Sequence, residues 1–345
     1  MAPASSSVQT IANPSGENFQ AFILEDGQGA RAMILEWGAT LASLEAPDRT
    51  GRTGHLVRGF ADPLDFTRPH PYLNGIVGRV ANRIRGGRFE LDGVRYQLAC
   101  NDHLHHLHGG PRGFDRVRWD GHCGTDGTSV TLHHTSEHGT EGYPGRLRVT
   151  ATYTLEDHVL ALDLEATTDR PTLVNLSHHA YWNLSGTGDV SDHLLDISGD
   201  QYTPTHRSLV PTGKLGSVDG TPLDFRVAMR LGDLLGAGKL LPAGYDHHLV
   251  VRGDPGQLRR FANLSHPPSG RNMELYATHP GLQLYTGGGL DGSLVGRGGD
   301  LVRFGGVCLE PQHFPDAPHH ANFPTIVLRP DQHYVQRMEF RLSAH

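Results

Sequence analysis

The segment TLVNLSHH, residues 172–179, has the alternation of a β-strand that separates an apolar face from a polar one. Val174 and Leu176 fall on one face, while His179 falls on the other together with two small polar residues, Asn175 and Ser177. Histidine has an ordinary pKa close to neutrality, so both of its protonation states are accessible. His179 is therefore a candidate general acid or base on a polar strand face.

The segment GGVCLEPQ, residues 305–312, gives a second candidate of the same kind. Its apolar residues Val307 and Leu309 face one way, while Cys308, Glu310 and Gln312 face the other. A glutamate in an otherwise apolar strand is costly to bury unless it is used or paired. Glu310 could serve as a general base, but a single histidine or glutamate on a strand is more often a hydrogen-bonded structural residue. Spacing alone does not assign the role.

The 24 histidines also suggest a metal site, above all in NDHLHHLHGG, residues 101–110. On a strand His106 and His108 share one face, as do His103 and His105, so a chelate of two histidines is geometrically possible. No H-E-x-x-H or C-x-x-C motif accompanies them, and the metal signal is weak.

The elements that must position these residues are mostly strands. Alternation over 146–166 predicts a hairpin with its turn at Glu156–His158. A second hairpin is predicted in RFELDGVRYQL, where Asp92-Gly93 suits a two-residue turn with positive φ. Further strands are expected in the following segments: 32–44, 129–135, 172–179 and 306–310.

Helical signals are few, because Gly232 interrupts and Gly236 ends the best candidate, Val227 to Leu235. Many short strands between Gly, Pro and Asp turns predict an all-β fold, a large antiparallel β-sandwich. No polar linker or change in composition divides the chain. We expect one domain over residues 1–345, with a flexible N-terminus over residues 1–15.

Composition narrows the class of protein. The net charge is -7 and the sequence has no basic block, so it does not predict a basic surface that could bind nucleic acid. Cys100, Cys123 and Cys308 are odd in number and far apart, so a disulfide framework is not indicated. The N-terminal residues lack the pattern of a secretory signal, and no apolar run is long enough for a membrane span. The expected protein is cytoplasmic and binds neither membrane nor nucleic acid.

Six segments occur together in one order: GRVANRI (78–84), HLHGGPRGFDRVRW (106–119), VNLSHHAYWNLSG (174–186), YDHHL (245–249), GLQLYTGGGLDG (281–292) and CLEPQHFPDAPHHANFP (308–324), followed by VLRP. In this order the chain, from about Gly75 to Pro330, resembles the galactose mutarotase (aldose 1-epimerase) family.

The resemblance implies a large antiparallel β-sandwich with an open groove for a monosaccharide, and an aldose 1-epimerase activity that needs no cofactor and no metal. It implies that His179 is the acid and Glu310 the base. It further implies that five residues bind sugar hydroxyls: Asn82, Arg83, His108, Asp246 and Gln283. Such a site needs both donors and acceptors, which these side chains supply.

Other interpretations of the same residues stay open. Arg83 could be a framework ion-pair residue, Asn82 a turn residue and Gln283 a strand partner. Of the aromatic pair Tyr181 and Trp182, either could pack on a sugar's apolar face or in the core.

The chain departs from the family pattern at four histidines: His103 and His105 in a loop where the family has glycine and asparagines, and His178 and His248 where asparagine is typical. Sugar preference stays open for this reason, and the sequence does not indicate the oligomeric state. Rival functions are a non-catalytic carbohydrate-binding sandwich, an epimerase-like enzyme for a phosphorylated or tailored sugar, whose phosphate Arg83, Arg112 and Arg116 could bind, and a metal-dependent hydrolase.

Overall fold

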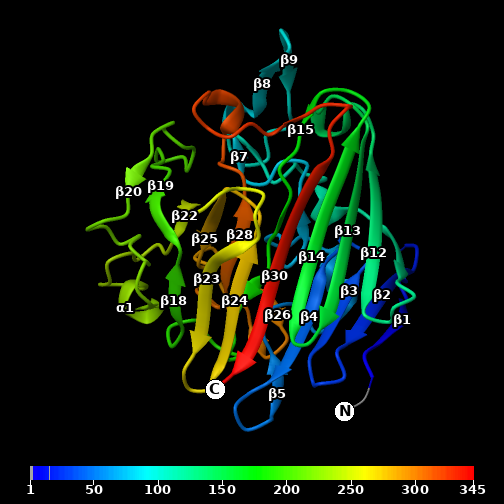
Figure 1. Ribbon diagram of the computed structural model, residues 1–345, viewed down its shortest axis with the longest axis vertical. Helices are drawn as coiled ribbons and strands as arrows, with labels where there is room; N and C mark the ends of the chain where they lie inside the picture. The colour runs from blue at the N-terminus through cyan, green and yellow to red at the C-terminus, as the bar shows by residue number, and fades with distance from the viewer. Residues whose placement is uncertain (1–2, 15) are drawn as a thin grey trace.

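The computed structural model describes residues 3–14 and 16–345, which form layered β-sheets joined by long loops (Figure 1). The largest sheet has nine antiparallel strands. In spatial order these are β11 (Asp120–Cys123), β12 (Ser129–Ser136), β13 (Leu147–Glu156), β14 (Val159–Thr168), β30 (Tyr334–Ala344), β24 (Arg271–Ala277), β23 (Arg259–His266), β18 (Leu194–Ile197) and β21 (Met229–Arg230). The hairpin predicted over 146–166 is confirmed as β13 and β14, with Asp157 and His158 in the turn at positive φ.

A six-stranded sheet carries the chemistry-bearing segments. Its order is β17 (Tyr181–Trp182), β28 (Val307–Gln312), β25 (Gly281–Tyr285), β22 (Asp246–Val251), β19 (Gly199–Tyr202) and β20 (Gly216–Ser217). Neighbouring strands in it are antiparallel. In Figure 1 its strands β25 and β28 lie behind β23 and β24, and β19 and β20 lie at the left.

The N-terminal region forms a five-stranded antiparallel sheet of β1 (Ser5–Ile11), β2 (Phe19–Glu25), β3 (Arg31–Leu35), β4 (Leu41–Pro47) and β5 (Thr53–His55). The flexible terminus expected over residues 1–15 is wrong for β1, because all seven of its residues pair with β2. Residues 1, 2 and 15 lie outside the described part of the chain.

Five two-stranded ladders complete the strands: β6 (Ile76–Val77) with β16 (Ser177–His178), β7 (Arg83–Ile84) with β10 (His106–Leu107), β8 (Arg88–Leu91) with β9 (Val94–Gln97), β15 (Thr172–Leu173) with β29 (Val327–Leu328), and β26 (Val295–Gly296) with β27 (Gly299–Asp300). The predicted β8–β9 hairpin is confirmed, with Asp92 at φ 52° and Gly93 at φ 78°. Short 3₁₀ turns lie at Pro63–Thr67, Arg85–Gly87, Phe114–Arg116, Thr140–Gly142 and Ala317–His319.

Three predicted elements differ from those observed. The strand expected over 32–44 is two strands, since a turn at Gly38 and Ala39, both at positive φ, separates β3 from β4. The strand expected over 172–179 keeps its alternation but forms named strands only at its two ends, β15 and β16, with a single parallel bridge between Asn175 and Val80 in the middle. The helix expected over 227–235 shortens to α1 (Leu231–Leu234), the only α-helix among the described residues. In that part of the chain no helix has the length and apolar character to cross a bilayer.

One apolar cluster joins all three large sheets. It contains Phe22 and Leu24 from β2, Leu162 from β14, and Leu284 and Leu309 from the six-stranded sheet, each almost fully buried. Because the inner side chains of β25 and β28 are committed to this core, their alternate residues must face away from it. The fold therefore predicts that Gln283 and Glu310 point to the same side of their sheet.

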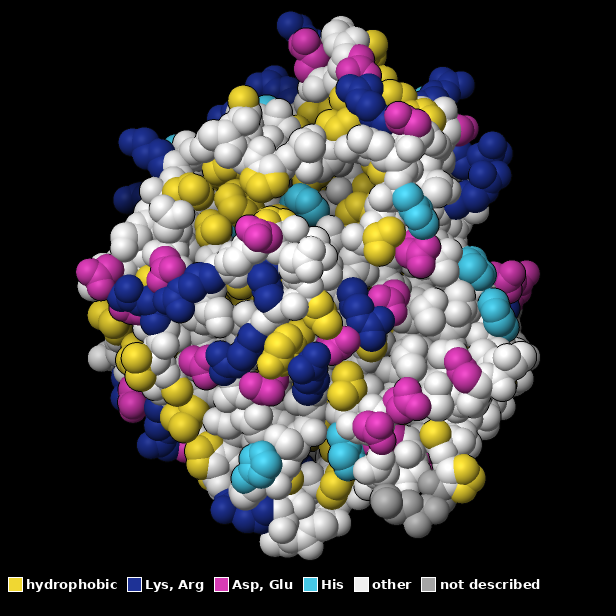
Figure 2. Space-filling model, viewed as in Figure 1, with side chains coloured by type: hydrophobic (Ala, Val, Ile, Leu, Met, Phe, Trp, Pro, Cys, Tyr) yellow, Lys and Arg dark blue, Asp and Glu magenta, His cyan; other side chains and the backbone are white. Residues whose placement is uncertain are grey.

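The outer face of the nine-stranded sheet is charged and paired. Figure 2 shows acidic and basic side chains interspersed over this face. Arg337 lies 2.5 Å from Asp163 and 2.9 Å from Glu339, and Arg341 lies 2.7 Å from Glu339. This face is thus the solvated side of the sandwich.

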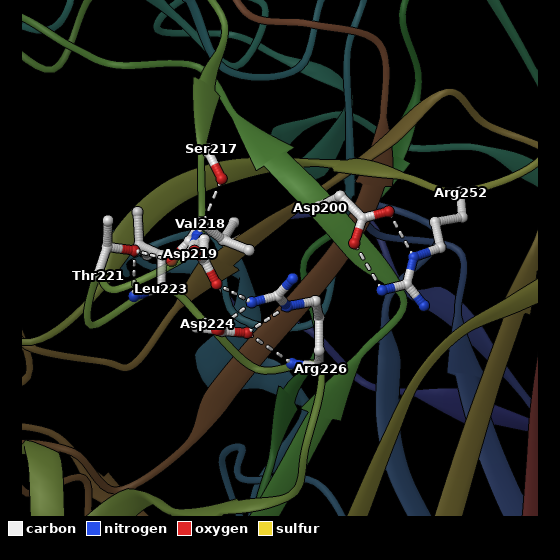
Figure 3. Close-up of polar contacts among 9 residues, drawn as sticks. All are labelled: Asp200, Ser217, Val218, Asp219, Thr221, Leu223, Asp224, Arg226 and Arg252. Carbon is white, nitrogen blue, oxygen red and sulfur yellow. Dashed lines mark hydrogen bonds and ion pairs between the residues drawn. The ribbon is translucent and has the colours of Figure 1, made fainter.

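A second set of ion pairs holds the long loop between β20 and β21 (Figure 3). Arg226 binds both Asp219 and Asp224, while Arg252, the residue after β22, binds Asp200 of β19 through two bonds of 2.6 Å. These contacts are exposed, and exposed pairs of this kind contribute about 0–1 kcal/mol each. The Arg226 pairs join two points within the loop, and the Arg252 pair joins β19 to the residue that follows β22.

Candidate active site

A pocket of about 180 Å³ opens on the face of the six-stranded sheet that points away from the core. All seven predicted site residues line it: Asn82, Arg83, His108, His179, Asp246, Gln283 and Glu310. The volume is below the roughly 300 Å³ at which pockets for drug-sized ligands begin, so the pocket suits a small ligand.

His179 reaches the pocket because the strand before it is bonded to β28. The Ser177 hydroxyl donates to the carbonyl of Pro311 at 2.7 Å, and the His313 amide donates to the Asn175 side chain at 2.9 Å. The backbone of His179 is fixed further by its amide, which donates to Gly75 at 3.0 Å. The predicted polar face is confirmed, but Asn175 and Ser177 position His179 and do not line the pocket.

Glu310 lies in a row of side chains across three strands. Gln283 of β25 is its direct neighbour in register, and His248 of β22 is the next residue in the same row. Gln283 donates from Nε2 to Asp246, which is the first residue of β22, the strand that contains His248. Glu310, Gln283 and Asp246 therefore lie on one face of the sheet, as the core packing requires.

Asn82, Arg83 and His108 come from the ends of the β7–β10 ladder. Asn82 and His108 both have positive φ, at 63° and 50°, which turns their side chains out of the ladder toward the pocket. The backbone amide of Asn82 donates to His108 Nδ1 at 3.2 Å. Arg83 donates to Asp102 at 2.7 Å and lies 3.6 Å from Asp246. Asn82 is therefore both a turn residue and a pocket residue, and Arg83 both an ion-pair residue and a pocket residue.

Aromatic rings form the remaining wall. Tyr72, Tyr181 and Tyr285 line the pocket, whereas Trp182 lies in the main core. The sequence left the choice between Tyr181 and Trp182 open, and alternation resolves it. Tyr285 was missed although it stands two residues after Gln283 on the same strand, a signal that would have found it. Tyr72, in a loop at φ 57°, has no periodic signal.

His179 and Glu310 meet in the pocket, with Nε2 and Oε1 3.7 Å apart. Both residues are buried, at 4% and 1% exposure. Burial lowers the pKa of His179 to about 4. Burial raises the pKa of Glu310 well above its ordinary value, and the nearby Asp246 adds to that rise while Arg83 opposes it. At pH values between the two shifted pKa values, His179 and Glu310 together hold one titratable proton. An acid–base pair requires this state.

The pocket also contains the strongest metal-like geometry among the described residues. Ligand atoms of His108, His179 and Glu310 all lie within 4.8 Å of one another. The His106–His108 chelate considered from sequence is wrong, because both His106 nitrogens are engaged, with Ala99 O and with the Tyr143 hydroxyl, each at 2.7 Å.

The four histidines that depart from the family pattern do not line the pocket. His178 points into the core beside Tyr153 and Phe340, and His248 lies against Phe314 with ring centroids 4.8 Å apart. Gly281 leaves room for the His248 ring, since a Cβ there would lie 2.4 Å from it.

Known proteins share this architecture over their full length. A solved aldose epimerase homologue from C. elegans superposes with a TM-score of 0.86 at 30% identity, covering 99% of each chain. A galactose 1-epimerase from Lactobacillus acidophilus NCFM superposes with a TM-score of 0.87 at 27% identity, again over 99% of both. The fold and its polar pocket thus define a β-sandwich of the mutarotase class.

Sequence comparison gives the family. The aldose 1-epimerase family model matches residues 20–341. The galactose mutarotase of Rattus norvegicus is 40% identical over 313 residues, which is 90% of each chain. The aldose 1-epimerase of Escherichia coli K12 is 31% identical over 337 residues, 96% of this chain and 97% of that one. The chain belongs to the aldose 1-epimerase family of isomerases, so the predicted activity, interconversion of α and β anomers, is confirmed at the level of the family.

Proposed function

We propose that this chain interconverts the anomers of free aldoses by general acid–base catalysis, with Glu310 as the base and His179 as the acid. The observation that carries the proposal is the 3.7 Å separation of His179 Nε2 and Glu310 Oε1 across one pocket. Glu310 removes the proton of the anomeric hydroxyl while His179 protonates the ring oxygen, and the bond between C1 and that oxygen breaks. Rotation about C1–C2 and the reverse transfers close the ring on the other face.

Asn82, Arg83, His108, Asp246 and Gln283 would bind the sugar hydroxyls. Two buried acceptors support this role, because Gln283 Oε1 and Glu310 Oε2 have no hydrogen-bond partner among the described residues. Such atoms are costly to leave unpaired. Sugar hydroxyls are the donors that would satisfy them, and the tyrosine rings offer an apolar wall to the sugar ring.

Charge favours a free sugar over a phosphorylated one. The charged groups that line the pocket are Arg83, Asp246 and Glu310, and Arg83 is already paired with two carboxylates. Arg116 donates to the His70 carbonyl and lies over the Tyr72 ring, and Arg112 is not among the lining residues. No unpaired cation of the described pocket is left to bind a phosphate dianion.

Polarimetry of freshly dissolved aldoses tests the proposal and reveals the preferred sugar. Glu310→Gln and His179→Asn should each lower turnover by about 10²- to 10⁴-fold, because each removes one proton-transfer group. Glu274→Gln and His333→Asn are matched controls, since both residues form ion pairs well exposed to solvent. Wild-type turnover in either active-site variant would refute the assignment. Sugar binding without turnover in the unaltered protein would favour the non-catalytic alternative.

The grouping of His108, His179 and Glu310 favours a metal-dependent reaction as a second candidate. The acid–base proposal needs these groups free, so mutarotation should be unchanged after dialysis against a chelator. A loss that Zn²⁺ restores would support the metal alternative.

We further propose that the protein works in the cytoplasm. Its three cysteines are unpaired, and Cys100 is exposed, which suits a reducing compartment. Cell fractionation with a tagged chain tests this location.

A further inference from the structure

We propose that Cys308 is a positioning residue for the reaction: its thiol donates to Nδ1 of His179 and so keeps the imidazole proton on Nε2, facing Glu310. The inference rests on the proposed function of His179 as the acid. It assigns a task to a buried cysteine whose side chain does not itself line the pocket.

The contact follows from the strand geometry. Cys308 stands two residues before Glu310 on β28, so both side chains leave the same face of the strand. The sulfur lies 3.6 Å from His179 Nδ1, within the range of a sulfur hydrogen bond, and Cys308 is fully buried. Strand β28 thus places one side chain beside each ring nitrogen of His179: Cys308 beside Nδ1 and Glu310 beside Nε2.

The two tyrosine hydroxyls nearest to Cys308 have hydrogen-bond partners of their own. Tyr181 and Tyr285 flank Cys308 in register on the two neighbouring strands. The Tyr181 hydroxyl donates to Pro71 O at 2.9 Å, and the Tyr285 hydroxyl accepts from the Gly289 amide at 2.9 Å. Within the part of the chain that the structure describes, the thiol is the polar side-chain group that contacts Nδ1.

The direction of the bond determines the tautomer. Burial raises the pKa of the Cys308 thiol well above its ordinary value, and the neighbouring Glu310 and Asp246 raise it further, so the sulfur keeps its proton. A thiol that donates requires an unprotonated Nδ1, and the neutral ring then carries its hydrogen on Nε2. This is the nitrogen that faces the pocket, so the ring is set to donate to a sugar oxygen before any sugar binds.

Removing the thiol should separate kcat from KM. In Cys308→Ala the ring loses its Nδ1 partner, and part of the population should move its proton to Nδ1, away from the pocket. Because an ordinary hydrogen bond is involved, kcat should fall about 3- to 10-fold while KM changes little. Cys308→Ser keeps a donor at the same position and should recover part of the loss. Cys123→Ala, a half-buried cysteine on β11, should match the unaltered protein.

The direct test is ¹⁵N NMR of protein labelled at histidine, with the His179 signals assigned by their absence in His179→Asn. The expected result is an Nε2–H tautomer in the unaltered protein and in Cys308→Ser, and a shift toward Nδ1–H in Cys308→Ala. An Nδ1–H tautomer in the unaltered protein, or identical signals and kcat in Cys308→Ala, would overturn the proposal. Circular dichroism shows whether each variant is folded, and Cys308→Val, which also lacks a donor, carries the test if the alanine variant is not.

This readout separates the inference from the function on which it rests. If His179→Asn kept full turnover, the acid assignment would fail, and the tautomer in Cys308→Ala would still report whether the thiol sets the ring. If turnover collapsed in His179→Asn while the tautomer ignored Cys308, the acid assignment would stand and the positioning role would be wrong.

Discussion

At the scale of single residues, burial gives His179 and Glu310 opposite pKa shifts for one physical reason. Removal from water disfavours the charged form of each, which lowers the pKa of His179 to about 4 and raises that of Glu310 well above its ordinary value. The pair therefore holds one proton over a wide range of pH. When this proton is redistributed from Glu310 to Nδ1 of His179, the carboxylate and imidazolium that the reaction uses are formed, Nε2–H still faces the pocket and the Cys308 sulfur becomes the acceptor. The guanidinium of Arg83 favours that carboxylate.

These shifts predict the pH dependence of kcat/KM. Activity should fall on the acid side near pH 4, where the lowered pKa of His179 lets the pair bind a second proton. It should fall on the alkaline side well above the ordinary pKa of a glutamate, where the raised pKa of Glu310 lets the last proton leave. Mutarotation rates in buffers of constant ionic strength measure both limbs. An acid limb at about pH 6.5, the ordinary value of a solvated histidine, would contradict the account.

The sequence predicts the seven site residues through two kinds of signal. Alternation alone separates His179 and Glu310 from the core-facing residues beside them. The remaining five depend on the family resemblance. Asn82 and His108 stand at positive φ beside a ladder of two residues per strand and leave no periodic trace, while the strands that carry Arg83, Asp246 and Gln283 are not among those predicted from alternation. Tyr72, at positive φ, and Asp102, which pairs with Arg83, both lie outside the named strands, so no alternation pointed to either of them.

At the scale of elements, the bonds between the segment 175–179 and β28 decide whether acid and base meet. Ser177 is fully buried, and its hydroxyl satisfies the carbonyl of Pro311, the residue after Glu310. The two catalytic candidates, 131 residues apart in the chain, are thereby held in one register.

Ser177→Ala should destabilise the protein by about 1–3 kcal/mol, because it leaves a buried carbonyl without its donor. Urea unfolding followed by tryptophan fluorescence measures the change. Ser343→Ala, at an exposed position on β30, is the matched control and should have no effect beyond about 0.5 kcal/mol. Equal stability of the two variants would show that the contact does not hold the segment.

Elements with strong local signals were predictable, and those set by long-range contacts were not. The Asp92-Gly93 turn and the β13–β14 alternation each carry their own evidence, and both hairpins formed. The segments 32–44 and 172–179 read as continuous strands, but their pairing depends on partners distant in sequence. In the second of them, the side chain of Asn175 accepts a hydrogen bond from the His313 amide. No local sequence pattern predicts this contact.

At the scale of the whole molecule, buried histidines make the fold sensitive to acid. Burial lowers the pKa of His178, His193 and His248 to about 3, and that of His70, His106 and His313 to about 4. The unfolded chain binds protons at these positions near pH 6.5. Their neutral form is therefore compatible with the fold above that pH, and stability is lost as pH falls toward the folded pKa values.

Each such histidine costs up to about 1.4 kcal/mol per pH unit below pH 6.5. The melting temperature should therefore fall by on the order of 10 °C between pH 7.5 and 5.0. Because one core joins the three large sheets, the loss should appear as a single cooperative transition. Calorimetry at both pH values measures it, and an unchanged midpoint or two separate transitions would contradict this account of the core.

If His179 and Glu310 act as one unit, the effects of replacing them should not be additive, and a comparison of the single and double variants measures this. Polarimetric turnover should be measured for Glu310→Gln, His179→Asn and the variant with both changes. If one coordinated pair of proton transfers opens the ring, the double variant should lose no more activity than the more impaired single variant. Losses that multiply would show that the two residues act independently and would contradict the account.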